Sequence, residues 1–422
     1  MGTKFWHSIL PRHVYIHPMS HSSHQHFDVA ICGGGMVGIT LAIALAREGL
    51  AVALIEKAAM LTQLEPSFDG RVSAIAEGSR RILDHIDAWE HMAPHAEPIL
   101  DIRVSDGNAP FFLHYDHREV GDAPFGHIVE NRYIRHALHS AAQLSNLTII
   151  DSAALHEFKR DDVGVTLQLK GKEIRCRLLV AADGKQSEIR KLAGIKAAEW
   201  KYGQTAIVCT IAHRLPHHGL AQERFLPAGP FAVLPMRDNQ SSLVWVEPDD
   251  RVGLYLELPE ADFVQEIHER VGDYLGELRL ASQRFSYSLS LMHAKSYIAP
   301  RLALIGDAAH AIHPIAGQGV NLGFRDVGVL TELIVDKFKL GLDIGSDEVL
   351  QHYQRWRRFD NIAMLAVTDG LNRLFSNNIP PIRLARGAGL WAVSKLPPLK
   401  RFFMRDAMGL TGDLPKLMKE NS

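Results

Sequence analysis

A glycine-rich segment between two apolar runs is the first feature whose residue types and spacing could support chemistry. Gly33, Gly35 and Gly38 follow the apolar residues 29–31, and a second apolar run at residues 52–55 ends in Glu56. The pattern predicts a strand, a tight turn, a helix and a parallel strand, with glycines that let the backbone approach a pyrophosphate at the helix N-terminus. Glu56 follows at close to the spacing of roughly 20 residues expected for a carboxylate that binds ribose hydroxyls. The chain is therefore predicted to bind a dinucleotide.

Two later apolar runs also end in turns that carry an aspartate. Residues 178–182 lead into Asp183 and Gly184, and residues 302–305 lead into Gly306 and Asp307. Asp-Gly alone is typical of many turns, because both residues favour turns for local reasons. The second turn is more informative, since Asp307 offers a carboxylate to a polyol hydroxyl. The glycines after it precede a helix predicted over residues 320–330, whose N-terminal N–H groups can hold partial negative charge.

A metal site is not expected. His310 and His313 are spaced to share one face of a helix, but no third ligand is evident and Pro314 favours a loop. The three cysteines are far apart and lack CxxC spacing, which indicates neither a disulfide framework nor a zinc site.

Composition indicates an ordinary folded protein of two or three domains. The 422 residues are 46% hydrophobic and 22% charged, and the formal net charge of −2 gives no reason to expect a nucleic-acid partner. No uncharged apolar run approaches the roughly 18 residues needed to cross a bilayer. The cysteine content suits a reducing compartment. We therefore expect a cytoplasmic protein, with peripheral contact at the inner face of the membrane as an alternative.

Both ends of the chain differ from the rest. Residues 1–26 contain six irregularly spaced histidines and no acidic residue, which favours a disordered tail or a start assigned too early, with Met19 as the alternative start. Between Asp369 and Asp406 basic residues alternate with apolar and aromatic ones, and no acidic residue occurs. That mixture suits an anionic bilayer surface, and it suits equally a helical tail packed on the body.

In this order, the three turns resemble those of the FAD-dependent aromatic hydroxylases of the para-hydroxybenzoate hydroxylase type. Within that group the chain is similar to the ring hydroxylases of ubiquinone biosynthesis, from residue 27 to about residue 412. The segments that carry the similarity are residues 71–75, 128–131, 229–235 and 313–323.

The resemblance implies roles for the matching residues. The first glycine group and Glu56 would hold the ADP half of FAD, Arg71 would lie beside the flavin, and Asp307 would bond the ribityl chain. Asn131 stands where many relatives carry an arginine that touches the flavin. The N–H groups of residues 319–321 would face the pyrimidine edge of the flavin, where negative charge accumulates on reduction. The full predicted cofactor set is Gly33, Gly35, Gly38, Glu56, Arg71, Asn131, Asp183, Asp307, Pro314, Gly317, Gly319, Val320 and Asn321.

The predicted fold class is α/β, with a discontinuous Rossmann-like FAD-binding domain, an inserted antiparallel-sheet substrate domain and a helical C-terminal region. The FAD domain must be discontinuous because its motifs are spread along most of the chain. Strands of the inserted sheet are expected at residues 205–211, 231–234 and 243–246, and a C-terminal helix at 349–370. The predicted divisions are 27–100, 128–198 and 288–345 for the FAD-binding domain, 101–127 and 199–287 for the substrate domain, and 346–422 for the C-terminal region.

The resemblance also implies a reaction. NAD(P)H would reduce FAD, dioxygen would form a flavin 4a-hydroperoxide, and oxygen would pass to the aromatic ring of a (poly)prenylated phenol. The partners that the resemblance implies are the membrane surface and other quinone-biosynthesis proteins. No side chain is identified as the base for the phenol, and the ring position, the electron donor and the oligomeric state are left open. Two alternatives remain: a non-catalytic FAD-binding component of a quinone-biosynthesis complex, and another flavoprotein oxidoreductase on the same scaffold.

Overall fold

The computed structural model describes residues 25–65, 70–107, 112–312, 318–375, 386, 389 and 392–420. The predicted strand, turn, helix and parallel strand are confirmed as β1 (Gln25–Cys32), α1 (Met36–Arg47) and β2 (Val52–Ile55). β1 begins two residues inside the predicted tail, and residues 1–24, with Met19, lie outside the described residues.

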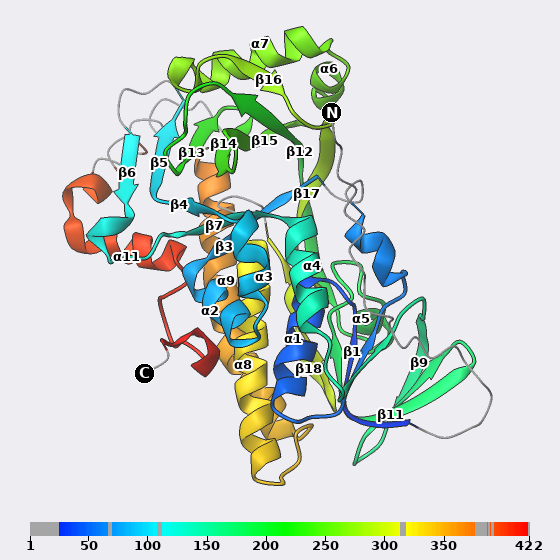
Figure 1. Ribbon diagram of the computed structural model, residues 1–422. Helices are drawn as coiled ribbons and strands as arrows, with labels where there is room; N and C mark the ends of the chain where they lie inside the picture. The colour runs from blue at the N-terminus through cyan, green and yellow to red at the C-terminus, as the bar shows by residue number, and fades with distance from the viewer. Residues whose placement is uncertain are drawn as a thin grey trace, which may run out of the picture.

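A mostly parallel sheet forms the first layer of the molecule (Figure 1). Its order is β18-β19-β11-β1-β2-β8, and the five strands from β19 to β8 run parallel. Its central strands carry unbroken apolar, buried runs at residues 29–32, 52–55 and 178–181, because helices bury both faces of a parallel sheet. The further strands are β18 (Ile298–Ala299), β19 (Leu302–Leu304), β11 (Lys172–Ala181), β8 (Leu147–Ile150), and the antiparallel extension β9 (Leu155–Arg160) and β10 (Val165–Leu169).

A second, largely antiparallel sheet has the order β20-β17-β12-β15-β14-β13-β5-β6. The three strands predicted for the inserted domain lie within β12 (Ala197–His213), β14 (Gly229–Met236) and β15 (Gln240–Pro248), and their antiparallel pairing is confirmed. The remaining strands are β5 (Asp101–Asp106), β6 (Phe112–Asp116), β13 (Leu220–Leu226), β16 (Leu278–Leu280), β17 (Phe285–Ala294) and β20 (His310–Ala311).

The predicted divisions can be compared with these pairings. β5 pairs with β13, which joins residues 101–106 to the inserted sheet. The division at residue 288 falls inside β17, a strand that pairs with β12 along most of its length. The predicted domain boundaries therefore remain predictions. The boundary at residue 288 would cut β17 into two parts.

The second sheet has two different faces. Its outer face packs on α6 (Val252–Leu256) and α7 (Glu260–Val271), around Trp245 and Phe263. We call the opposite face of this sheet its inner face. Its residues in β13 and β14 pack on a small sheet of β3 (Val72–Ala76), β7 (Gly126–Glu130) and β4 (Glu97–Ile99), which lies between the two large sheets (Figure 1).

Helices fill the space around both sheets. α8 (Gly319–Lys339) packs against α1 and against the long α9 (Asp347–Phe375), which contains the helix predicted at 349–370. α11 (Pro397–Ala407) starts at a proline, as helices tolerate at their first position. The other α-helices are α2 (Glu77–His85), α3 (Trp89–Met92), α4 (Asn131–Ala141) and α5 (Glu188–Leu192), and the 3-10 helices are η1 (Met60–Leu64), η2 (Ala93–His95), η3 (His117–Glu119), η4 (Asp273–Leu275), η5 (Gly306–Ala308) and η7 (Lys416–Met418).

Within the described part of the chain, no helix is both long enough and apolar enough to cross a bilayer. The three cysteines, Cys32, Cys176 and Cys209, are buried and free.

Candidate cofactor site

The three predicted turns begin side by side at one edge of the parallel sheet. Cys32 at the end of β1 pairs with Ala181 at the end of β11, which pairs with Leu304 at the end of β19. The Ala182 N–H donates to the Cys32 carbonyl at 2.7 Å, and the Ile305 N–H donates to the Ala181 carbonyl at 3.0 Å. Ligands of open α/β sheets bind outside the carboxyl ends of such strands.

The first two turns touch each other, which accounts for two of the glycines. Gly33 has a φ of +113°, and a Cβ there would lie 2.2 Å from the Ala182 carbonyl oxygen and 2.7 Å from the Asp183 nitrogen. A Cβ at Gly38 would lie 1.9 Å from the Gly33 carbonyl oxygen. Any side chain at either position would displace backbone, so glycine is required at both.

The third turn reaches the same place through Val37, in the first turn of α1. A Cβ at Gly306 would lie 3.3 Å from Val37 Cγ1, and a Cβ at Gly323 would lie 2.5 Å from Val37 Cγ2. The turn before η5 and the first part of α8 therefore pack directly on the glycine-rich turn. All three segments meet, although the sequence separates them widely.

Arg190 fastens the second turn to the third. Its buried guanidinium donates to the Ala308 carbonyl at 2.9 Å and to the Lys185 carbonyl at 2.8 Å. The Arg190 N–H in turn donates to Ser187 Oγ, the N-cap of α5, at 2.9 Å. The sequence places Ser187 and Arg190 after Asp183, but this bridging role depends on the fold.

Glu56 is held beside the glycine-rich turn by backbone amides. Its carboxylate is buried and accepts the Gly34 N–H at 2.6 Å and the Ala58 N–H at 2.9 Å. A carboxylate has about four acceptor sites, so these two bonds orient it and leave capacity for the hydroxyls of a ribose.

Asn321 ties the start of α8 to the small sheet. Its Oδ1 accepts the Ala76 N–H at 3.0 Å, and its Nδ2 donates to the Ala74 carbonyl at 2.8 Å. Gly319, Val320 and Asn321 are the first residues of α8, and N–H groups in the first turn of a helix have no acceptor within the helix. The start of α8 is therefore fixed in position and presents N–H groups.

Asn131 fixes the neighbouring strand. Its Oδ1 accepts the Ser73 hydroxyl at 2.7 Å, and its backbone N–H donates to the Arg71 carbonyl at 3.1 Å. The Arg71 guanidinium lies 4.8 Å from the centre of the Tyr287 ring, on β17. These contacts connect Arg71 and Asn131, through β3, to the start of α8.

Asp307 lies in the same charged neighbourhood. Asp307 is an exposed residue, yet the protein around it removes enough water to raise the pKa of its carboxyl. The charges of His310, Arg71 and Lys185 act in the opposite direction and lower that pKa.

A buried ionic network behind the third turn was not predicted. Asp326 is fully buried in α8; its Oδ2 accepts the Gly306 N–H at 2.9 Å and contacts His310 Nε2 at 2.6 Å, and its Oδ1 accepts Arg357 Nε at 2.7 Å. Desolvation raises the pKa of Asp326, but His310 and Arg357 outweigh it and lower the pKa to about 2. The one feature of the sequence that could have indicated this network is an acidic residue on the apolar face of the predicted helix.

His310 is thus committed to a carboxylate. Among the described residues, no group of three or more His, Cys, Asp or Glu side chains is arranged to hold a metal ion. His313, Pro314 and Gly317 lie outside the described residues.

The edge of the parallel sheet where the three turns meet has the features that a flavin dinucleotide needs. A Cβ at Gly35, which precedes α1, or at Gly319, which starts α8, would meet nothing within 4 Å, so open space lies before both helix N-termini. Asp183 Oδ1 is buried and finds no hydrogen-bond partner in the described ranges. Two helix starts for phosphate and flavin, an oriented carboxylate for ribose and an orphaned buried oxygen fit FAD.

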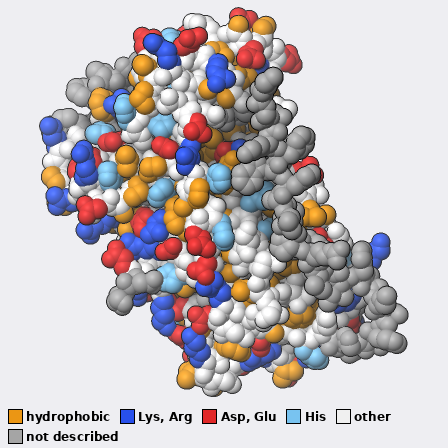
Figure 2. Space-filling view, viewed as in Figure 1, with side chains coloured by type: hydrophobic (Ala, Val, Ile, Leu, Met, Phe, Trp, Pro, Cys, Tyr) orange, Lys and Arg blue, Asp and Glu red, His pale blue; other side chains and the backbone are white. Residues whose placement is uncertain are grey.

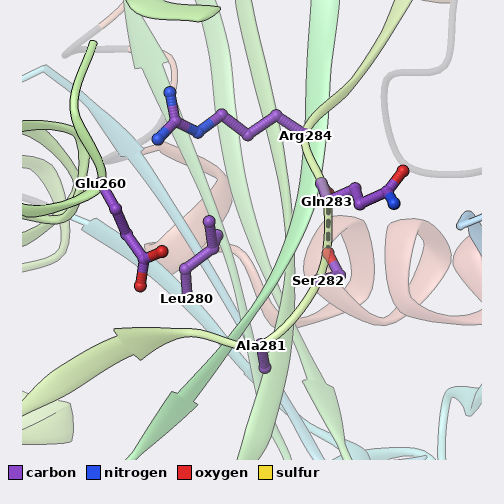
Figure 3. Close-up of a pocket in the computed structure, with 6 residues that line it drawn as sticks. All are labelled: Glu260, Leu280, Ala281, Ser282, Gln283 and Arg284. Atoms are coloured by element: carbon purple, nitrogen blue, oxygen red, sulfur yellow. Dashed lines mark hydrogen bonds between the residues drawn. The ribbon is translucent and has the colours of Figure 1, made fainter.

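A separate surface pocket lies on the inserted domain, between the start of α7 and residues 280–284 (Figure 3). Arg284 donates from it to the carbonyls of Leu256 and Leu258 at 3.0 and 2.7 Å, and its guanidinium stacks 4.2 Å from the Phe263 ring. Phe263 belongs to the outer-face cluster, and the pocket contains none of the predicted cofactor residues.

Comparison with known structures supports this fold. p-Nitrophenol 4-monooxygenase PnpA from Pseudomonas putida superposes with a TM-score of 0.76 over 92% of this chain and 99% of that chain, at 21% identity. Residues 26–365 match the family described as FAD binding domain. The fold and the site therefore define a FAD-binding protein.

Sequence comparison narrows the class. The chain is 48% identical over 407 residues to ubiquinone hydroxylase UbiL from Rhodospirillum rubrum, covering 95% of each chain. It is 36% identical to 3-demethoxyubiquinol 3-hydroxylase from Escherichia coli, covering 92% of this chain and 100% of that protein, and 32% identical to human ubiquinone biosynthesis monooxygenase COQ6, with 90% and 92% covered. The chain belongs to the ubiquinone hydroxylase family of FAD-dependent monooxygenases.

Proposed function

We propose that this protein hydroxylates the aromatic ring of a prenylated phenol in ubiquinone biosynthesis, using FAD, NAD(P)H and dioxygen. The observation that carries the proposal is the 48% identity to a ubiquinone hydroxylase along 95% of both chains. The meeting of the three turns supports it, because it gives FAD a place to bind.

Each part of the edge has a task in this proposal. The open start of α1 at Gly35 receives the pyrophosphate, Glu56 the adenosine ribose, and Asp307 the ribityl hydroxyls. Residues 319–321 present N–H groups to the pyrimidine edge of the flavin and stabilise negative charge there. Bound FAD supplies the electron transfer and the activation of dioxygen.

Purified protein loaded with FAD tests the proposal. We expect a phenol such as 2-geranylphenol to stimulate NAD(P)H oxidation and to gain one oxygen atom by mass spectrometry. The methyl ether of the same compound is the matched control. Bound flavin without phenol-stimulated oxidation would instead support the non-catalytic component, and oxidation without ring hydroxylation would support another flavoprotein activity.

We further propose that the protein is cytoplasmic and touches the inner face of the membrane through α11. Leu396, Phe402 and Phe403 are 51%, 55% and 38% exposed at its start and along it. Basic side chains gather with hydrophobic ones on that side of the molecule (Figure 2). Such a surface suits anionic lipid, and it would bring the protein to a substrate whose prenyl chain gains about 0.8 kcal/mol per buried methylene.

Vesicle flotation tests the membrane contact. The double substitution Phe402→Ser and Phe403→Ser should weaken binding to vesicles that contain anionic lipid. Leu254→Ser is the control, because Leu254 is 67% exposed on α6, in the inserted domain. Equal binding of both variants would contradict the contact at α11.

A further inference from the structure

The strand β13 presents one carboxylate on the inner face of the second sheet. Side chains alternate along a strand, so Ala221, Glu223 and Phe225 point to one side and Arg224 to the other. Arg224 lies on the outer side, where it donates to the Arg270 carbonyl in α7 at 2.5 Å. Glu223 is therefore on the face turned away from α7.

Two contacts locate Glu223 relative to the cofactor site. Ala221 packs in one cluster with Ala74 of β3, the residue whose carbonyl is bonded by Asn321 at the start of α8. Phe225 stacks on Phe375 at the end of α9, with ring centres 4.2 Å apart. Residues two apart in a strand are about 6.6 Å apart, so Glu223 lies between these two contacts. Figure 1 shows β13, the strand that carries it, near the end of α9.

The immediate neighbours of Glu223 in the sheet are apolar. Its cross-strand partners are Val104 in β5 and Ala232 in β14, and Val244 continues the row in β15. Glu223 is half-buried and, among the described residues, makes no hydrogen bond or ion pair. Burial alone raises its pKa to about 7.

Asp106, Asp369 and Arg71, which are charged residues described on this side of the sheet, have partners of their own. Asp106 in β5 pairs with Arg386 at 3.0 Å. Asp369 in α9 accepts the Tyr202 hydroxyl at 3.1 Å, and Arg71 lies over the Tyr287 ring. The donor for Glu223 is therefore not supplied by these groups.

A carboxylate that is removed from water without a donor destabilises a fold, and a ligand that brings a donor removes that penalty. An apolar wall with a single acceptor matches a phenol, which has an apolar ring and one hydroxyl proton. A purely structural residue at this position would be better apolar, since both neighbours across the strands are.

We propose that Glu223 is the catalytic residue that accepts the hydroxyl proton of the substrate phenol; this rests on the proposed function. The phenolic O–H bond breaks, an O–H bond forms on the Glu223 carboxylate, and the electron pair stays on the phenolate oxygen. That pair raises the electron density at the ortho and para ring carbons, which then bond the electrophilic oxygen. The carboxyl group returns its proton to water after the product leaves. A base that titrates near the working pH is suited to this task.

Binding measured without turnover tests the proposal. In equilibrium dialysis with the FAD-loaded protein, the affinity for 2-geranylphenol should fall as the pH drops below about 7, since a protonated carboxyl is a weaker acceptor. Glu223→Gln should show no such change with pH. The methyl ether, which has no proton to donate, should bind equally to both proteins. Equal affinities of wild type and Glu223→Gln for the phenol across this range would overturn the inference.

Turnover gives the second measurement. Glu223→Gln should lower the rate of hydroxylated product by roughly 10²-fold and remove the acidic limb of its pH profile, while Glu223→Asp keeps that limb. FAD content and phenol-independent NAD(P)H oxidation should match Glu260→Gln, a control on the outer face. An unchanged rate and profile would also overturn the inference. No product from the wild type at any pH would count against the proposed function instead, and the dialysis result would still decide the role of Glu223.

Discussion

Asp326 and Glu223 are both acidic residues held away from bulk water, but their surroundings differ in one respect. Asp326 contacts His310, Arg357 and the Gly306 N–H, and its pKa is lowered to about 2. Glu223 has apolar neighbours, and burial acting alone raises its pKa to about 7. The charge of each carboxylate is therefore determined by whether it has hydrogen-bonding and charged partners, and not by burial alone. The first carboxylate is a fixed anion that holds a turn, and the second is available to a ligand.

The largest expected effect on stability comes from removing Asp326, the carboxylate that has charged partners. Asp326→Ala leaves Arg357 buried without its main partner, and removing one member of a buried ion pair costs roughly 3–5 kcal/mol. We expect that loss in the free energy of unfolding, measured by urea denaturation. Asp336→Ala is the matched control on the same helix: Asp336 pairs with Lys416 at the surface, where such pairs contribute about 0–1 kcal/mol. Equal losses for both variants would contradict the role assigned to Asp326.

A smaller effect distinguishes Gly33, which packs against protein backbone, from Gly35, which faces open space where a ligand could bind. Gly33→Ala forces a Cβ against the Ala182 carbonyl and should cost about 1–3 kcal/mol of unfolding free energy. Gly35→Ala meets nothing within 4 Å, so the apoprotein should change by less than about 1 kcal/mol. Both variants should retain less FAD, by roughly tenfold or more for Gly35→Ala, measured by flavin absorbance after gel filtration. Normal FAD retention by Gly35→Ala would show that the pyrophosphate lies elsewhere.

The smallest expected effect concerns Glu223, the carboxylate without a partner among the described residues, and how it changes stability with pH. The folded-state pKa of Glu223 lies above its ordinary value of 4.5, so the folded state binds more protons than the unfolded state between about pH 4.5 and 7. The stability contributed by Glu223 is therefore fully present below pH 4.5 and is lost as the pH rises through about 7. A rise of this size corresponds to at most about 3 kcal/mol, and because solvent screens this half-buried side chain we expect the wild type to lose on the order of 1 kcal/mol relative to Glu223→Gln between pH 4 and 8. Denaturation curves at both pH values measure it, and a constant difference would contradict the raised pKa.

Much of the cofactor edge could be predicted from the sequence because its signals are local. Gly33, Asp183 and Gly306 each follow an apolar strand within one or two residues, and parallel neighbours bring such strand ends together. The extents of the three elements around the first turn also follow from hydrophobic runs of suitable length.

The rest depends on contacts between distant segments. Nothing near Asp326 in the sequence indicates that Arg357 will reach it from another helix. Glu223 is the middle one of three consecutive polar residues in β13, so the strand has no polar–apolar alternation that would reveal which face meets solvent. Asn131, expected at the flavin, also bonds Ser73, a contact that requires β3 and α4 to be adjacent.

The ionic network around Asp326 bears on how the protein matures. β1 emerges from the ribosome early, yet its neighbour β11, and β19 on the other side of β11, come from far later in the chain, and Arg357 later still. Because such long-range pairings form slowly, a nascent or truncated polypeptide that stops before α9 cannot complete the ionic network behind the third turn. Flavin loading is therefore expected late in biogenesis, and fragments that lack residues 347–422 should emerge colourless.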